Sequence, residues 1–297
     1  MTIEDKKRIY KIAKYKKQQA EKDYAEKKQR AEQLDLNLFG NLKLIFGLTP
    51  EKVLKWFQEK LPELSEHWYD LWENEHIASF TVAGVASMDL LLEIQKQLEK
   101  ALESGMTFAE FQENIEEKLD SAGWVSGETS LSPSRLTTIW RTNLKSAYSA
   151  GRYESMMENK QSRKYFQWRT MSDNVVRETH AELESRVFSL DDEIVKTHWP
   201  PLDFNCRCHV VAMNDRDLKR KNLTVENSAD GEIKEIPVTL PDGTEKTVTT
   251  YIDKNGVSIP TGVGFSFNPG IKPYRPDLKS YPKELKKQYQ NYLDSSG

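Results

Sequence analysis

The segments TIWRTNLKSAYSAGRYESMM (residues 138–157), YFQW (165–168), DNVVRETH (173–180) and HWPPLDFNCRCHVV (198–211) follow one another through the middle of this chain. They hold both cysteines of the protein and three of its five histidines, next to a helical run whose polar positions carry arginine and lysine. Such a concentration of rarely used residues predicts a compact core. We expect a helical scaffold before it and a β-rich tail after it.

The bulk composition limits the class of protein. The chain has 297 residues, of which 37% are hydrophobic and 30% charged, and a formal net charge of −3. This length suits two compact units with an arm, because a single core rarely grows beyond about 250–300 residues. No run approaches the roughly 18 apolar residues of a membrane-spanning helix, and the start MTIEDKKRIY lacks the apolar stretch of a secretory signal. We therefore expect a soluble protein of a reducing cytoplasm, with no membrane partner.

Residues 1–35 are predicted to form a basic helical arm. Within residues 1–30, nine lysines and two arginines stand against three glutamates and two aspartates, a net charge of +6. The apolar positions make too thin a stripe to bury against a core, so a solvated helix is the simpler interpretation. The alternative is an arm that binds double-stranded DNA or an acidic protein surface. Its basic residues would be Lys6, Lys7, Arg8, Lys11, Lys14, Lys16 and Lys17.

Residues 36–125 are predicted to form a helical domain of short amphipathic helices. Ser87 is placed to cap one helix, which Gly105 closes, and Thr107 with Glu110 makes a capping box for the next. Apolar residues recur at three- and four-residue spacing between these signals. We therefore interpret the Trp and Phe residues of this domain as core, and we assign it no catalytic role.

Ser132 and Pro133 predict the start of a long helix. One of its stripes is apolar and includes Gly151, which is small enough to let another backbone come close. The opposite stripe is basic and hydroxylic, and a solvated face explains it. Arg141 and Asn143 also suit a second role, in which they hold the next segment by hydrogen bonds.

Downstream patterns are mixed. Residues 164–170 alternate as in a half-buried strand, and Asp173 is expected to cap a short helix that carries Arg177, His180 and Glu184 on one face. Turn signals in the stretch 236–260 predict a hairpin or meander. The expected fold is α+β and predominantly helical. Its parts are a basic helical arm (1–35), a helical domain (36–125), a mixed motif core (126–215) and a C-terminal region with a β-hairpin (216–297).

The two cysteines allow two interpretations. If NCRCHVVAM is a strand, Cys206 and Cys208 point to one face with their Cα atoms roughly 6.5–7 Å apart, at or beyond the limit for a disulfide. Two thiolates at this spacing suit one soft metal such as zinc, with His180 or His198 as a further ligand. A buried cysteine is also simply a small apolar residue, and this is the interpretation we adopt, with no metal or cofactor.

The same region also allows a catalytic interpretation. Asp173, His180 and Cys206 are the residue types of an orienting acid, a base and a nucleophile. Their spacing does not predict that they converge, and the sequence contains no phosphate-binding glycine loop and no nucleophile elbow. A hydrogen-bonded cluster of Asp173, Arg177 and His180 that holds the proline turn explains the same residues. We therefore predict a protein that is not an enzyme.

The order of these motifs, TNLKSAYSAGRYESM, an aromatic segment, D-x-x-x-R-x-x-H, an acidic pair and PPLDFNCRC, resembles the phage Mu F-like minor head proteins, also called the phage head morphogenesis family. The resemblance is clearest over residues 135–210. The residues that carry the motif core are Arg141, Thr142, Asn143, Tyr148, Gly151, Arg152, Asp173, Arg177, His180, Pro201, Asn205, Cys206, Arg207 and Cys208.

The resemblance implies a virion component. Proteins of this kind bind the portal during prohead assembly, work beside coat and scaffold proteins, stay inside the capsid, and in some phages associate with DNA. The expected location is the host cytoplasm during assembly and the capsid interior afterwards. The alternative is a nucleic-acid-binding or metal-dependent nucleic-acid-modifying protein that uses the His/Cys core.

Overall fold

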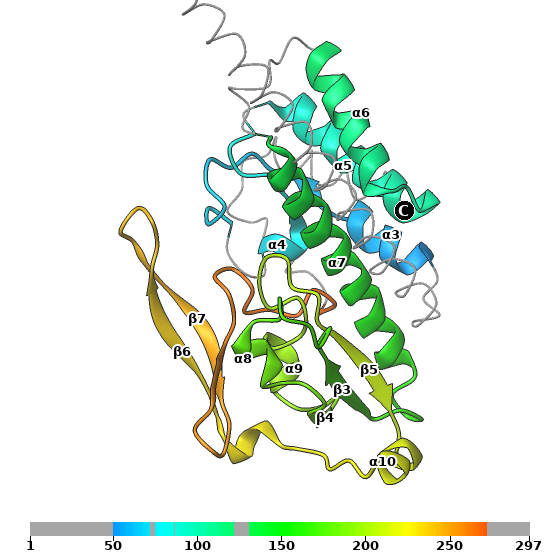
Figure 1. The fold of residues 1–297 in the computed structure, drawn as a ribbon, viewed down its shortest axis with the longest axis vertical. Helices are drawn as coiled ribbons and strands as arrows, with labels where there is room; N and C mark the ends of the chain where they lie inside the picture. The colour runs from blue at the N-terminus through cyan, green and yellow to red at the C-terminus, as the bar shows by residue number, and fades with distance from the viewer. Residues whose placement is uncertain (1–49, 72–74, 86, 122–130, 272–297) are drawn as a thin grey trace, which may run out of the picture.

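A computed structural model describes residues 50–71, 75–85, 87–121 and 131–271 (Figure 1). The predicted basic arm, residues 1–35, lies outside these ranges. The described part is an α+β protein, with helices in its first half and small sheets in its second, which confirms the predicted fold class. None of the helices described combines the length and the apolar run that a bilayer crossing requires.

Within these ranges the helices are α3 (Pro50–Gln58), α4 (Glu75–Ala78), α5 (Met88–Ser104), α6 (Phe108–Ser121), α7 (Pro133–Glu158), α8 (Glu178–Ala181), α9 (Ile194–Thr197) and α10 (Asp215–Lys221), with a 3-10 turn, η2, at Ser228–Asp230. The strands are β1 (Leu61–Pro62), β2 (Ser79–Phe80), β3 (Tyr165–Arg169), β4 (Val187–Ser189), β5 (His209–Met213), β6 (Glu232–Thr239), β7 (Glu245–Ile252) and β8 (Ser258–Pro260). They pair as β1-β2, β4-β3-β5 and β6-β7-β8, the first parallel and the others antiparallel.

Local signals place the helix ends where the sequence predicted them. The Ser87 side chain accepts a hydrogen bond from the Leu90 amide, and Gly105 closes α5 in the left-handed conformation at φ 76°. Thr107 and Glu110 form the reciprocal capping box, with the Thr107 amide 2.7 Å from the Glu110 carboxylate and the Glu110 amide 3.3 Å from the Thr107 hydroxyl. Each cap satisfies backbone donors that the first helical turn leaves unpaired.

The helix α7 links the two cores of the molecule (Figure 1). Its first half contributes Leu136, Trp140 and Leu144 to a buried cluster with α3, α5 and α6, and Met156 near its end joins a second cluster around β3. The expected domain boundary near residue 125 falls in an undescribed stretch. The first half of α7 packs with the helices that precede it, and its end packs in the motif core. The single helix α7 therefore belongs to both buried clusters.

The second core surrounds the sheet β4-β3-β5. Phe166 and Trp168 on the central strand β3 pack with Trp199, and Tyr251 from the meander β6-β7-β8 closes the same cluster. On the other side of β3, Gln167 is buried as well, and its side chain donates to the Ser185 carbonyl at 3.2 Å. The centre of the predicted strand is therefore buried on both faces. The predicted meander is confirmed, and it packs against this core through Tyr251 and Ile259.

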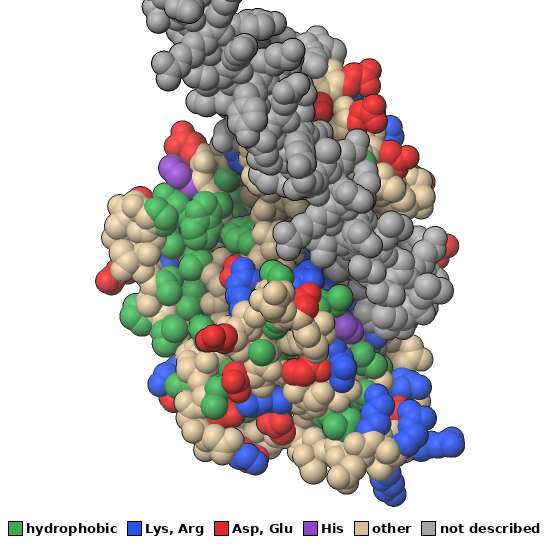
Figure 2. Space-filling view, in the orientation of Figure 1, with side chains coloured by type: hydrophobic (Ala, Val, Ile, Leu, Met, Phe, Trp, Pro, Cys, Tyr) green, Lys and Arg blue, Asp and Glu red, His purple; other side chains and the backbone are tan. Residues whose placement is uncertain are grey.

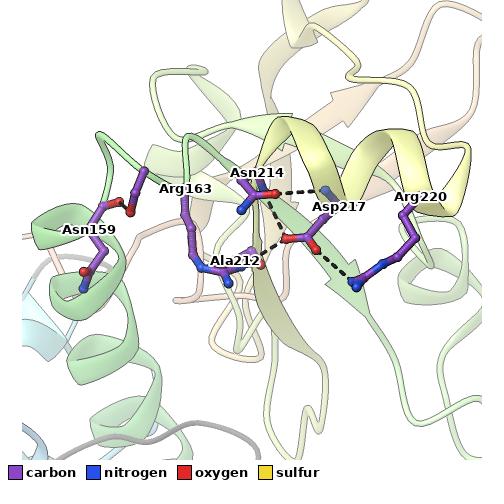
Figure 3. A network of polar contacts seen from close by, with 7 residues as sticks. Asn159, Arg163, Ala212, Asn214, Asp217 and Arg220 are labelled. Carbon is purple, nitrogen blue, oxygen red and sulfur yellow. Dashed lines mark hydrogen bonds and ion pairs between the residues drawn. The ribbon is translucent and has the colours of Figure 1, made fainter.

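The helix α10 is anchored to the end of the sheet by a polar network (Figure 3). Asn214 caps the helix in a capping box with Asp217. Arg163, just after α7, donates to the Asp217 carboxylate at 3.1 Å and to the Ala212 carbonyl of β5 at 3.2 Å, while Arg220 reaches Asp217 from the far side at 2.8 Å. Arg163 and the Asp217 carboxylate together thus connect the segment after α7 with β5 and α10.

Two local predictions were wrong. Asp173 does not cap a helix: its side chain accepts from the Val175 amide in a turn, and α8 begins only at Glu178. Cys206 and Cys208 do not lie on a strand, because β5 begins at His209 and the chain before it turns through Asn205 at φ 57°. In both places a local hydrogen bond or a left-handed residue interrupts the regular element.

Candidate functional site

The polar stripe of α7 faces the motif core and not solvent, which corrects the prediction of a solvated face. Lys145 and Ser149 are buried. The Ser149 hydroxyl donates to the Pro200 carbonyl, and the Arg152 guanidinium donates to the Val210 carbonyl at 2.6 Å. Asn143 was expected to hold the next segment by hydrogen bonds, but its amide donates to the Ile139 carbonyl of its own helix. Ser149 and Arg152, further along α7, make the hydrogen bonds to the later segment instead.

Two arginine–carboxylate pairs join the segment around Asp173 to the segment around Arg207. Arg207 donates through two nitrogens to the two carboxylate oxygens of Asp173, at 2.6 and 2.7 Å. Arg177 pairs with Asp203 at 3.1 Å and donates to the Phe204 carbonyl at 3.0 Å. The Arg207 guanidinium holds the pKa of the Asp173 carboxyl below its usual value. Bidentate pairs of this kind fix geometry as well as charge.

Behind these pairs, His180 lies between the two cysteines. Its Nδ1 is 3.7 Å from the Cys206 sulfur and 3.8 Å from the Cys208 sulfur, and all three side chains are buried. The three potential ligand atoms lie within 4.8 Å of one another. This arrangement could hold one soft metal ion, and of the two candidate histidines it contains only His180.

The electrostatics of this cluster favour one charged thiol. The pKa of Cys206 is held well below its usual value, first by a hydrogen bond with Cys208 and then by His180. The pKa of Cys208 is raised, first by its hydrogen bond with Cys206 and then by burial. Burial lowers the pKa of Lys145 to about 8, while the two thiols oppose that change. A cation is thus buried beside the two sulfurs.

His198 has a structural role outside the cysteine cluster. Its Nδ1 lies 2.9 Å from the Thr197 hydroxyl and its Nε2 lies 2.9 Å from the Ile259 carbonyl, so both ring nitrogens have protein partners. Burial lowers its pKa to about 4, which keeps the ring neutral at ordinary pH. It connects the proline turn to strand β8 and takes no part in the cysteine cluster.

The catalytic constellation considered from the sequence is not assembled. Both carboxylate oxygens of Asp173 point to Arg207, while His180 faces the two sulfurs through Nδ1. An orienting acid has to bond the base, and here it bonds an arginine instead. The predicted cluster of Asp173, Arg177 and His180 is likewise divided between two ion pairs and the cysteine group.

The remaining core residues have structural positions. Gly151 lies against the backbone of α3, Tyr148 is half-buried beside the first core, and Pro201 is buried in the proline turn. The Asn205 amide donates to the Thr138 hydroxyl at 3.4 Å. Arg141 is half-buried on α7. None of these residues joins the His180 cluster.

Sequence reasoning missed a cavity of about 190 Å³ between α7, α4 and the loop 264–267. Its walls include Trp56, Trp68 and Phe267. The buried Thr142 hydroxyl also lines it and has no hydrogen-bond partner within the described part of the chain. Lys60 lies at the cavity with its ammonium over the Trp56 ring at 4.3 Å, and burial lowers its pKa to about 7. No local pattern marks these residues, because they come from segments far apart in the chain.

The comparisons with known proteins agree with the motifs. The family model described as Phage Mu protein F like protein matches residues 92–211, which include every residue of the motif core. The chain is 32% identical over 246 residues to the Putative capsid assembly protein F of Escherichia phage Mu, covering 77% of this chain and 56% of that protein. It is 31% identical over 225 residues to the Mu-like prophage FluMu F protein of Haemophilus influenzae, covering 71% and 54%.

The chain spans about half the length of the curated relatives it matches. No solved structure matches it with significance. The matched region contains every residue of the motif core, and the similarity to F proteins of phage origin extends over more than two thirds of the chain. The chain belongs to the phage Mu F-like family, as the order of its motifs predicted.

Proposed function

We propose that this protein is a minor capsid protein of head morphogenesis that binds the portal during prohead assembly, works beside coat and scaffold proteins, and resides inside the capsid. The observation that carries the proposal is its similarity to a relative named as a capsid assembly protein. The chemistry of the motif core supports it. Its polar side chains bond to other parts of the same chain and so stabilise the fold; they are Asp173, Arg177, Arg207, Ser149 and Arg152.

We propose no catalytic role for this core. The two cysteine side chains and His180 are each at most 5% exposed, so a substrate has no access to them in this conformation. A nucleophile has to reach its substrate at about 3 to 3.5 Å, which burial of this degree prevents. The alternative of a nucleic-acid-modifying protein would need that group to open.

An aromatic cluster is our candidate for the portal contact; Trp68 and Phe204 are its accessible members, and Tyr69 and Phe265 are buried. The Trp68 side chain is 40% exposed and lies edge-on to Tyr69 at 5.3 Å and to Phe204 at 6.0 Å, and Phe204 meets Phe265 at 4.8 Å. We call these four residues the aromatic patch. Figure 2 shows hydrophobic side chains gathered on the face formed by the 61–71 loop and the β6–β7 hairpin. Aromatic residues with a partly exposed ring are typical anchors of protein interfaces.

The test is capture of the portal protein of the same phage by the full chain at low salt and at about 1 M salt, where the Debye length falls to about 3 Å. We expect capture to survive the salt, because a packed protein interface depends little on exposed charges. Trp68→Ala should weaken capture about 30-fold, the effect of losing a hot spot of about 2 kcal/mol. Leu92→Ala is the control, because Leu92 is 44% exposed on α5, outside the patch. Loss of capture by both variants, or by neither, would remove the patch from the proposal, and no capture at all would remove portal binding.

We further propose that the basic arm, residues 1–35, contacts double-stranded DNA. It carries seven closely spaced basic residues, Lys6 to Lys17, in a chain of negative net charge. Phosphate contacts release counterions, so seven contacts would give a slope of log K against log salt of about −6. Deletion of residues 1–30 should abolish binding to a duplex fragment while portal capture persists. DNA binding that survives the deletion would refute the assignment to the arm.

A further inference from the structure

The cysteine cluster has a geometry that its own hydrogen bonds do not account for. Nδ1 of His180 stands almost equally far from two sulfurs, at 3.7 and 3.8 Å. A ring nitrogen has one lone pair or one N–H in the ring plane, so it makes one such hydrogen bond at a time. The two similar distances, with all three ligand atoms within 4.8 Å of one another, match the arrangement of ligands around a common centre.

We propose that His180, Cys206 and Cys208 bind one zinc ion that fastens α8 to the loop before β5. In tetrahedral zinc sites the metal lies about 2.3 Å from sulfur and about 2.0 Å from imidazole nitrogen, which places the nitrogen about 3.5 Å from each sulfur. The two observed separations differ from this value by a few tenths of an ångström.

The charge of the site suits its burial. Two thiolates and a neutral imidazole carry two negative charges, which a divalent ion cancels, and a neutral complex avoids the cost of an uncompensated buried charge. Soft thiolates combined with an imidazole select zinc among the divalent ions that take tetrahedral geometry.

The position of the cluster gives the metal a structural role. His180 belongs to the four-residue helix α8, and the cysteines lie in the turn that ends at His209. The Arg207–Asp173 and Arg177–Asp203 pairs join the same two segments at the surface. The ion would close this connection from the inside, where neither segment has a regular ladder of backbone hydrogen bonds. The inference is independent of portal binding.

The test is the metal content of the full chain, purified under reducing conditions without chelator. We expect about one zinc ion per chain. Exchange for cobalt should produce the near-ultraviolet thiolate-to-metal absorption band, which reports on Cys206 and Cys208 alone because they are the only two cysteines. Removal of the metal with a chelator should lower the Tm, and added zinc should restore it, since a ligand that binds the native state stabilises it.

Variants locate the site. Cys206→Ser, Cys208→Ser and His180→Gln should each lower the zinc content, whereas His67→Gln should keep it, because the exposed His67 pairs with Asp70 outside the cluster. Folded wild-type protein that contains no stoichiometric zinc and takes up none on titration would overturn the proposal. So would a folded double cysteine variant that keeps its metal. The wild-type measurement stands even where a variant does not fold.

Discussion

Gly151→Ala tests the contact between α7 and α3 that the motif glycine permits. A methyl group at Gly151 would lie 3.0 Å from Cγ2 of Val53, and 3.5 and 3.6 Å from the Val53 amide nitrogen and Cα. The two backbone distances are ordinary contacts, while the side-chain distance is too short. Val53 is only 1% exposed, so its side chain has little space into which to move.

Two effects of opposite sign set the magnitude. Replacing glycine by alanine inside a helix stabilises the helix by about 1 kcal/mol. Overpacking a buried contact costs about 1–3 kcal/mol. We therefore expect Gly151→Ala to lower the free energy of unfolding by about 1 kcal/mol. In a Val53→Ala background the short contact is gone, and the same substitution should become stabilising by up to about 1 kcal/mol.

The assay is urea unfolding of the full chain, followed by tryptophan fluorescence and circular dichroism, for the wild type, both single variants and the double variant. The coupling energy of this cycle should be about 1–3 kcal/mol, since the two residues touch. If Gly151→Ala is stabilising in both backgrounds by the same amount, the helices are not in close contact at this glycine and the reasoning fails.

Three further predictions concern buried or paired polar groups. Thr142→Val should raise the free energy of unfolding by about 1 kcal/mol, because the buried hydroxyl has no hydrogen-bond partner among the described residues; a loss of stability in thermal melts would contradict this. Burial lowers the pKa of Lys60 to about 7, so its burial penalty is complete below that pH and disappears near pH 10.5. Stability of the wild type should therefore rise relative to Lys60→Met between these values, and parallel curves would disprove it. The lowered pKa of Asp173 means that its pairing stabilises the fold above about pH 4 and is lost as the pH falls; Asp173→Asn should remove that part of the acid dependence, about 0.5 kcal/mol after solvent screening, and an unchanged acid profile would exclude it.

Local chemistry could be predicted without the structure. The caps at Ser87 and Thr107, the glycine that ends α5 and the start of α7 at Ser132 all act on backbone groups within three or four residues. Strand β3 and the meander β6-β7-β8 were predicted from alternation and turn residues, which are also local. The order of the motifs, which is a property of the chain alone, identified the family.

What the tertiary structure decided is which distant groups meet. The sequence offered His180 and His198 equally as partners of the cysteines, and only the path of the chain through α8 brings His180 to them, while His198 bonds to strand β8. The stripe of α7 that holds Lys145 and Ser149 has the polar composition of a solvent-exposed face, yet the motif core buries these two residues. The contacts of His180 with the cysteines and of His198 with β8 join residues from 26 to 61 positions apart, and local residue patterns do not specify which distant segments will pack together.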